Sequence, residues 1–119
     1  MQLNHLNLPM SRIPEAITFF ETHFGFTCVE VKGDAALAVL RGADGFILVL
    51  MRAKEQPLYP KFFHIGFLQQ DAAAVDYIFE QLNNDPALQP EKPGKIRDTY
   101  GFYFYFDTLM IEISCPQPV

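Results

Sequence analysis

The order of apolar segments along this 119-residue chain occurs twice, and this repeat limits the possible folds more than any other feature. The segment LNHLNL around His5 aligns with FFHIGF around His64, and each is followed by a helical pattern of similar length. Further on, DGFILVLM aligns with DTLMIEIS. An internal repeat of this kind indicates two copies of one supersecondary unit.

The first copy predicts one strand, one helix and three further strands. Leu3 to Leu8 is short, nearly alternates in polarity and is ended by Pro9, as in a short strand. For the helix, Ser11 is the expected N-cap, Pro14 falls in the first turn, and Gly25 is the expected C-terminal stop. Three apolar segments separated by Gly/Asp turns then predict strands at Phe26 to Val31, Ala35 to Arg41 and Phe46 to Arg52.

The second copy repeats this order after a connector. Ala53 to Pro60 is polar and contains two prolines, so we expect neither helix nor central strand there. Lys61 to Leu68 predicts a strand, and Asp71 can cap the helix that follows. A Pro-rich loop from Asp85 to Gly94 leads to three short strands, the last two being Gly101 to Phe106 and Leu109 to Ser114, joined by a turn at Asp107-Thr108.

These patterns predict an α+β fold of two βαβββ modules. We expect one domain, 1–119, with module one at 1–52, the connector at 53–60 and module two at 61–119. A helix covers one face of each sheet, so the opposite faces are free to curl into an incomplete barrel around a metal-containing cavity. Half of the residues are apolar, which is enough for one such core.

His5, His64 and Glu112 are the candidate metal ligands. The histidines occupy equivalent places in the two modules, and side-chain alternation puts Glu112 on the face opposite Ile111 and Ile113. Two imidazoles and one carboxylate suit one divalent metal ion (Fe, Mn, Zn or Ni) with positions open to substrate. The structural alternatives are an ordinary hydrogen-bonded histidine and a Lys or Arg ion pair for the glutamate.

The segment FYFYF alternates phenylalanine and tyrosine. This pattern directs the phenylalanines to the helix-covered face and Tyr103 and Tyr105 to the cavity. The tyrosines are candidate catalytic residues that donate a proton or orient a small-molecule substrate; the alternative is that they are cavity wall. Lys95 and Arg97 either attract an anionic group or are solvated surface charges.

Charge and composition exclude several classes of partner. The net charge of -5 and the scattered Lys and Arg residues predict no nucleic-acid partner. The sequence has no signal-like N-terminus and no apolar stretch of roughly 20 residues, so we expect no membrane partner and a cytoplasmic location. Cys28 and Cys115 are expected to be buried free thiols.

LNHLNL with its helix ending in FGF, FFHIGF, and MIEIS resemble the vicinal-oxygen-chelate superfamily. This superfamily includes glyoxalase I, type I extradiol dioxygenases, fosfomycin-resistance thiol transferases and bleomycin-resistance proteins. The resemblance covers nearly the whole chain and implies a single-domain member whose metal ligands are His5, His64 and Glu112. It also implies a homodimer, which the high apolar fraction of so small a chain favours.

Departures from the family's patterns narrow the range of activities that the resemblance implies. Glyoxalase I typically has a second carboxylate where this chain has Val49, so three ligands remain, as in dioxygenases and fosfomycin-resistance enzymes. The Asp-Pro-Asp-Gly turn of the family is shortened here to Asp107-Thr108, and the dioxygenase tyrosine falls near Phe104. The C-terminal SCPQPV lacks the basic residue usual in fosfomycin-resistance enzymes.

Three functions follow from these observations. The first is a metal-dependent lyase, dioxygenase or transferase of the glyoxalase/dioxygenase type, whose substrate chelates the metal through neighbouring oxygens. The second is a metal-free small-molecule-binding protein of the bleomycin-resistance type with an aromatic cavity. The third is a cofactorless regulatory or scaffolding module. The three ligands favour the first function, and the shortened turn favours the second.

Overall fold

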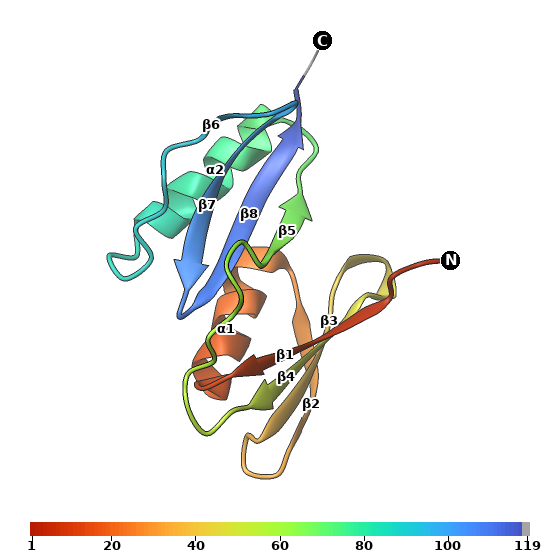
Figure 1. Ribbon diagram of the computed structural model, residues 1–119. Coiled ribbons are helices and arrows are strands. Elements are labelled where there is room, and N and C mark those ends of the chain that lie inside the picture. The colour runs from red at the N-terminus through yellow and green to blue at the C-terminus, as the bar shows by residue number, and fades with distance from the viewer. Residues whose placement is uncertain (118–119) are drawn as a thin grey trace. The chain divides into compact units, whose positions relative to one another are not determined.

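The computed structural model describes residues 1–117. The chain divides into two compact units, Met1–Pro57 and Leu58–Val119 (Figure 1). None of the helices in the described part of the chain is long and apolar enough to cross a membrane.

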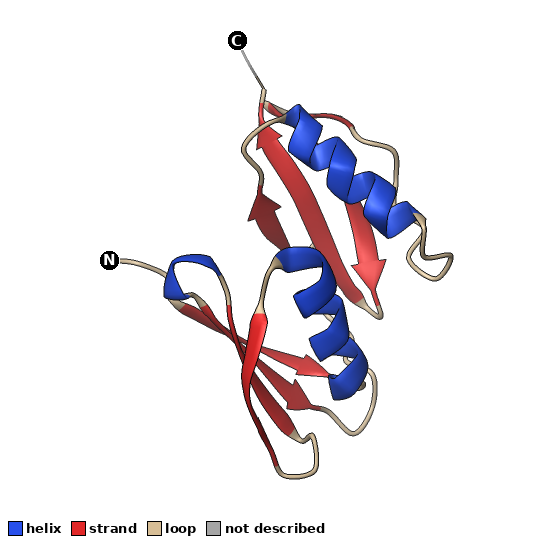
Figure 2. Ribbon diagram, turned by 180° about the vertical axis from the view of Figure 1, so that it is seen from behind, coloured by secondary structure: helices blue, strands red, loops and turns tan. Residues whose placement is uncertain are grey.

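The first unit is a four-stranded sheet with one helix. Its elements are β1 (His5–Met10), α1 (Ile13–Phe24), β2 (Thr27–Lys32), β3 (Leu37–Arg41), the short 3-10 turn η1 (Ala43–Gly45) and β4 (Ile47–Arg52). The strand order is β1-β4-β3-β2, with β1 parallel to β4 and the other pairs antiparallel. Helix α1 contacts β2, β3 and β4 and covers one face of the sheet (Figure 2).

The second unit has the same topology. Its elements are β5 (His64–Leu68), α2 (Ala72–Asn83), β6 (Gly94–Ile96), β7 (Thr99–Phe106) and β8 (Leu109–Pro116). The order is β5-β8-β7-β6, with β5 parallel to β8, and α2 packs on β7 and β8. The predicted pair of βαβββ modules in an α+β fold is therefore confirmed.

The strand registers also confirm how the two modules align. In the first sheet Val49 lies opposite Asn7, and in the second sheet Glu112 lies opposite Gly66. Asn7 and Gly66 each follow the strand's histidine by two residues. Val49 therefore occupies, in the first sheet, the place that Glu112 occupies in the second.

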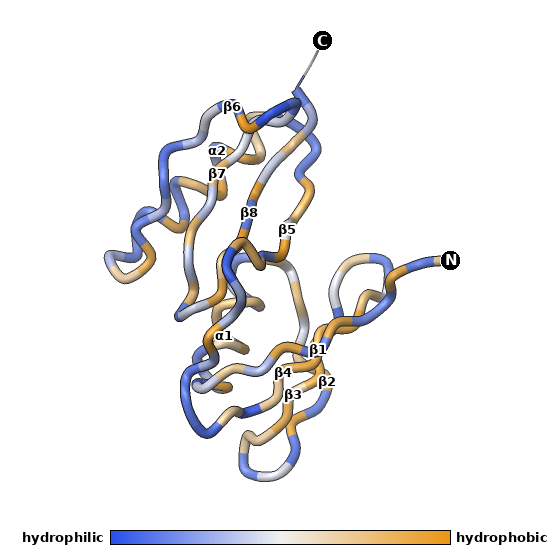
Figure 3. Tube along the Cα trace, in the orientation of Figure 1, coloured by the Kyte–Doolittle hydropathy of each residue, from blue (hydrophilic) through white to orange (hydrophobic). Residues whose placement is uncertain are grey.

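Each core lies between a helix and one face of its sheet. In β1 the side chains alternate, with Leu8 and Met10 buried and their neighbours exposed. In β7 the phenylalanines are buried, and the ring of Phe102 meets that of Phe79 from α2 edge-on. Tyr105 is 53% exposed, as the predicted alternation requires. The tube in Figure 3 shows the apolar stretches that run along the strands of both units.

Two of the three helix ends predicted from the sequence are found in the structure. The predicted stop at Gly25 is confirmed: it is left-handed, with φ 69°, and its N–H donates to the Phe20 carbonyl. The predicted cap at Asp71 is also confirmed, since its carboxylate accepts from the Ala74 N–H at 2.9 Å. The prediction of Ser11 as N-cap was wrong, because α1 begins one residue later and Arg12 caps it without a side-chain bond.

Several strand boundaries differ from those predicted, and two of the differences have a clear physical reason. Strand β1 continues through Pro9 to Met10, because β1 is an edge strand, where the missing proline N–H costs no ladder bond. Strand β5 begins at His64 rather than at Lys61, because the preceding residues form a turn in which the Phe63 N–H donates to the Pro60 carbonyl.

Both cysteines are free thiols. Cys115 is buried, as predicted, whereas Cys28 is only half-buried. Its backbone N–H donates to the Glu21 carboxylate, and its thiol lies 3.6 Å from the Glu30 carbonyl oxygen.

The close approach of β7 to β8 gives a test of the second sheet. A Cβ on Gly101 would collide with the Ile113 carbonyl oxygen and lie 2.7 Å from Ser114 Cα. We predict that Gly101→Ala lowers the free energy of unfolding by about 1 to 3 kcal/mol, measured by urea denaturation.

Gly94→Ala is the matched control, because no heavy atom lies within 4 Å of its added Cβ. Its unfolding free energy should stay within about 0.5 kcal/mol of the original. Equal urea midpoints for Gly101→Ala and the unsubstituted protein would contradict the described β7–β8 packing.

Candidate metal centre

His64 begins β5, and one nitrogen of its ring is fixed by the backbone. Its Nδ1 lies 2.9 Å from the Phe62 carbonyl oxygen. A carbonyl oxygen only accepts, so Nδ1 carries the proton and donates it. The lone pair of the neutral ring is then on Nε2, which is the arrangement that metal-binding histidines use.

Glu112 faces this nitrogen from the neighbouring strand. Its Oε1 lies 3.7 Å from His64 Nε2, and its Oε2 accepts a hydrogen bond from the Ser114 hydroxyl at 2.8 Å. Gly66, opposite Glu112, has no side chain, and a Cβ there would lie 3.9 Å from Glu112 Oε2. The carboxylate is therefore held by Ser114 through Oε2 and faces His64 with Oε1.

The separation of Nε2 and Oε1 has two chemical interpretations. Two ligands bound about 2.1 Å from one ion stand about 3.0 to 3.4 Å apart, slightly closer than the observed 3.7 Å. When His64 is protonated, the same two groups form an ion pair. Within residues 58–117, no Lys or Arg forms an ion pair with Glu112, so the alternative partner expected for this carboxylate is not found there.

Tyr103 completes the cluster in the second sheet. It lies directly opposite Glu112 in the β7–β8 register, and its ring meets that of His64 edge-on at 5.6 Å. A hydrogen bond to Glu112 is the main reason that the pKa of Tyr103 is raised; desolvation and the Glu112 charge add to it, while Arg97 opposes it. Tyr103 is therefore a neutral phenol at physiological pH, able to donate a hydrogen bond.

Tyr105 lies farther along the same face. It pairs with Met110 rather than with Glu112 and is 53% exposed. The structure thus brings His64, Glu112 and Tyr103 together, and Tyr105 lies on the same face of β7, two residues beyond Tyr103.

His5 belongs to the first unit and shows the same local arrangement as His64. Its Nδ1 lies 2.7 Å from the Asn4 side-chain oxygen, so in the neutral ring the proton is on Nδ1 and the lone pair is on Nε2. The places that correspond to Glu112 and Tyr103 are occupied in this sheet by the apolar pair Val49 and Val39. The first unit therefore supplies a single candidate ligand.

The donor set fits the predicted kind of ion, although no one unit contains a complete set. Across residues 1–117, no three His, Cys, Asp or Glu side chains gather into a metal-binding group. Two imidazole Nε2 atoms and one carboxylate are nevertheless ligands that suit Fe, Mn, Zn or Ni. The three-ligand site with His5, His64 and Glu112 remains a prediction.

Lys95 and Arg97 differ in their relation to this cluster. Lys95 lies opposite Tyr100, whose hydroxyl donates to Asp76 of α2, so Lys95 belongs to the helix-covered side of the sheet. Arg97 lies in the turn before β7, and its charge acts on Tyr103. Of these two cations, Arg97 is the one related electrostatically to the candidate centre.

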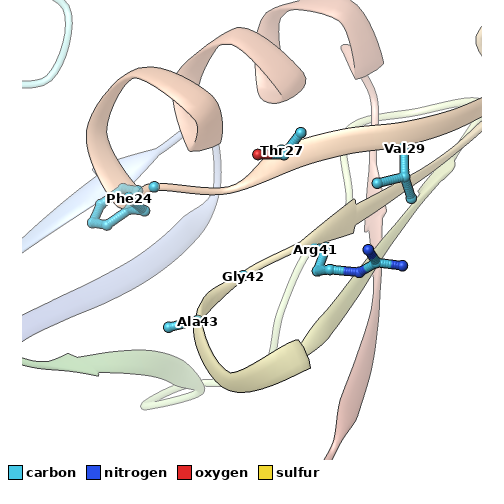
Figure 4. A pocket seen from close by; sticks show the side chains of 7 residues that line it. Phe24, Thr27, Val29, Arg41, Gly42 and Ala43 are labelled. Carbon is cyan, nitrogen blue, oxygen red and sulfur yellow. The ribbon is translucent and has the colours of Figure 1, made fainter.

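A cavity of about 410 Å³ lies elsewhere, on the first unit (Figure 4). It is lined by Phe24, Gly25, Thr27, Val29, Arg41, Gly42 and Ala43. Its walls are largely apolar, with one guanidinium and one hydroxyl group. None of the predicted site residues lines it.

Sequence reasoning missed three groups that support the candidate ligands. Ser114 follows Glu112 by two residues in the same strand, so period-two alternation was a usable signal. Asn4 precedes His5 directly, and a short side chain with an amide oxygen was a weaker signal. The Phe62 carbonyl had no signal in the sequence, because its position depends on a turn that contains no glycine.

Comparisons with known proteins define the family. The Glyoxalase/Bleomycin resistance protein/Dioxygenase superfamily matches residues 2–113, and the chain belongs to this superfamily. This confirms the family predicted from LNHLNL, FFHIGF and MIEIS. No curated protein matched the sequence.

Solved structures share the fold over nearly their whole length. A possible glyoxalase from Bacillus cereus is 40% identical, with TM-score 0.86, over 97% of this chain and 99% of that one. The fosfomycin resistance protein FosX from Listeria monocytogenes, complexed with Mn(II) and sulfate, is 18% identical, with TM-score 0.81, over 98% and 90%. A glyoxylase/bleomycin resistance protein/dioxygenase domain from Frankia sp. EAN1pec is 13% identical, with TM-score 0.81, over 98% of both chains. The last two likenesses concern the fold alone.

The raised pKa of Tyr103 gives a test of the cluster. The raised value means that the hydroxyl stabilises the fold below the ordinary tyrosine pKa of about 10, and that this stabilisation is lost as pH rises through the folded-state pKa. We predict that Tyr103→Phe lowers the unfolding free energy by about 0.5 to 1 kcal/mol at pH 8, with the difference shrinking above about pH 10. Urea denaturation at several pH values measures it.

Tyr77→Phe provides the control, because Tyr77 is an exposed residue of α2. The Tyr77 hydroxyl should make no measurable contribution to the unfolding free energy at any of these pH values. A Tyr103→Phe variant as stable as the original protein at pH 8 would show that the hydrogen bond to Glu112 is absent in solution.

Proposed function

We propose that this protein is a metal-dependent enzyme that acts on a small substrate, which chelates the metal through neighbouring oxygens. The observation that carries the proposal is the facing pair in the second sheet, His64 Nε2 and Glu112 Oε1, 3.7 Å apart. The hydrogen bond from His64 Nδ1 to the Phe62 carbonyl leaves that Nε2 free to bind an ion. Membership of a superfamily of glyoxalases and dioxygenases supports an enzyme of this general kind.

The proposed ligands of one divalent ion (Fe, Mn, Zn or Ni) are His5, His64 and Glu112. The repeat supports His5, because it is the first residue of β1 as His64 is of β5, and both rings use Nδ1 for a local hydrogen bond. The FosX structure with Mn(II) shows that the same fold accommodates a divalent ion. His5 comes from the same chain or from a second copy.

The bound ion and the protein's tyrosines would have different roles in the reaction. The bound ion would supply Lewis-acid polarisation of two neighbouring substrate oxygens. Tyr103, held neutral beside Glu112, is placed to donate a hydrogen bond or a proton to a substrate oxygen near the carboxylate. Tyr105 is the more exposed tyrosine and is proposed to contact the outer part of the substrate. The proposed reaction is that of a lyase, a dioxygenase or a transferase.

The alternative function is a metal-free small-molecule-binding protein of the bleomycin-resistance type. The aromatic open face of β7, with Tyr103 and Tyr105, favours it, because such side chains bind flat apolar ligands. The hydrogen-bond arrangement of the two histidines favours the metalloenzyme, since a wall of a binding cavity has no need of free Nε2 atoms.

Assembly and location complete the proposal. We propose that the protein is a homodimer, as the resemblance and the apolar composition imply. Sedimentation equilibrium, which measures the mass of the assembly in solution, tests this. We also propose the cytoplasm as its compartment, with which the two free thiols agree.

The metal content of the purified protein tests the proposed function. We predict about one Mn, Fe, Zn or Ni ion per chain, measured by elemental analysis of protein purified without a metal-chelating tag. His64→Ala and Glu112→Gln should each reduce the bound metal at least about tenfold, and His5→Ala should do the same, because each removes one of three protein ligands.

Matched controls are His23→Ala and Glu55→Gln, which change a histidine and a glutamate outside the proposed site. Both should keep the full metal content. A protein that binds no metal after reconstitution, with all five variants folded and alike, would overturn the metalloenzyme and favour the binding protein.

A further inference from the structure

The residues just before β5 form a turn with an unusual occupant. The Phe63 N–H donates to the Pro60 carbonyl at 3.0 Å, which closes a β-turn with Lys61 and Phe62 at its centre. Phe62 has φ 72°, the largest positive φ of any non-glycine residue in the described part of the chain. Turns of this kind prefer glycine or asparagine at that position, because a bulky side chain crowds the left-handed conformation.

Burial of its own ring does not offset this unfavourable backbone. The Phe62 side chain is 74% exposed, and its ring contact is with the Lys61 ammonium group, 5.0 Å from the ring centroid. The turn is held by its neighbours instead: the Phe63 ring stacks on Tyr59 at 5.1 Å, and the Phe62 carbonyl accepts the proton of His64 Nδ1. A strained residue kept by its surroundings is a frequent sign of a positioning role.

We propose that the left-handed backbone of Phe62 is a positioning device, which directs its carbonyl at His64 Nδ1 and so fixes the ring tautomer that presents Nε2 beside Glu112. The direction of this carbonyl is set by the Phe62 backbone angles, so a right-handed residue in the same place turns it away. The metal part of this inference rests on the proposed function, whereas the tautomer part does not.

The test uses substitutions that remove the same ring but differ in backbone preference. Phe62→Gly accepts positive φ freely, whereas Phe62→Pro fixes φ near -65° and Phe62→Val strongly disfavours positive φ. Because all three variants lose the phenyl group, loss of the ring does not explain a difference between glycine and the other two. Phe62→Val replaces Phe62→Pro if the proline variant does not fold, which circular dichroism shows.

The first readout is the tautomer of His64 in the metal-free protein, measured by ¹⁵N NMR in alkaline buffer, where imidazoles are generally neutral. We expect the Nδ1–H form in the original protein and in Phe62→Gly, and a substantial Nε2–H population in Phe62→Pro and Phe62→Val. The Nδ1–H form persisting in all variants would overturn the inference.

The second readout is the affinity for Mn(II), measured by isothermal titration calorimetry. Phe62→Gly should bind as the original does, and the proline and valine variants about 10- to 100-fold more weakly, the usual effect of losing a partner of a ligating histidine. Equal affinities in all variants overturn the metal part of the inference and leave the metal site intact. A tautomer change without any Mn(II) binding by the original protein supports the positioning role and overturns the proposed function instead.

Discussion

The parallel pairing of β5 with β8 is the constraint on which the candidate centre depends. In this register Gly66 lies opposite Glu112, so the carboxylate reaches the histidine at the start of the neighbouring strand. The register is fixed from the other face, where Ile111 and Ile113 are fully buried in the core. A slip of one residue would expose both isoleucines and bury the glutamate, so the packing of the core and the geometry of the site specify the same pairing.

The two modules share a topology but not a chemistry. The second sheet carries a histidine, a carboxylate and a tyrosine on adjacent strands, whereas the first carries one histidine and has Val49 and Val39 at the other two places. The first module therefore offers one candidate ligand, His5, and the second offers His64 and Glu112. Three ligands, rather than four, leave room on an ion for a substrate that binds through two oxygens.

Sequence patterns predicted the fold and identified the candidate site residues, because both depend on side-chain periodicity. Alternation placed the phenylalanines of β7 in the core and Glu112 on the open face, and the repeat identified the equivalent histidines. The patterns failed where backbone conformation decides: Pro9 is tolerated because β1 is an edge strand, and Phe62 occupies a turn position that usually carries glycine. The carbonyl that orients His64 could not be predicted, since its direction depends on that turn.

The most direct measurement of the central claim is a crystal structure of the protein soaked with Mn(II), with anomalous data collected to locate the ion. The account predicts one strong anomalous peak per chain, bonded to Nε2 of His64, to Glu112 and to Nε2 of His5, with both Nδ1 atoms still hydrogen-bonded as described. An ordered His64–Glu112 pair with no anomalous density beside it, at saturating Mn(II), would contradict the account and assign the pair a structural role.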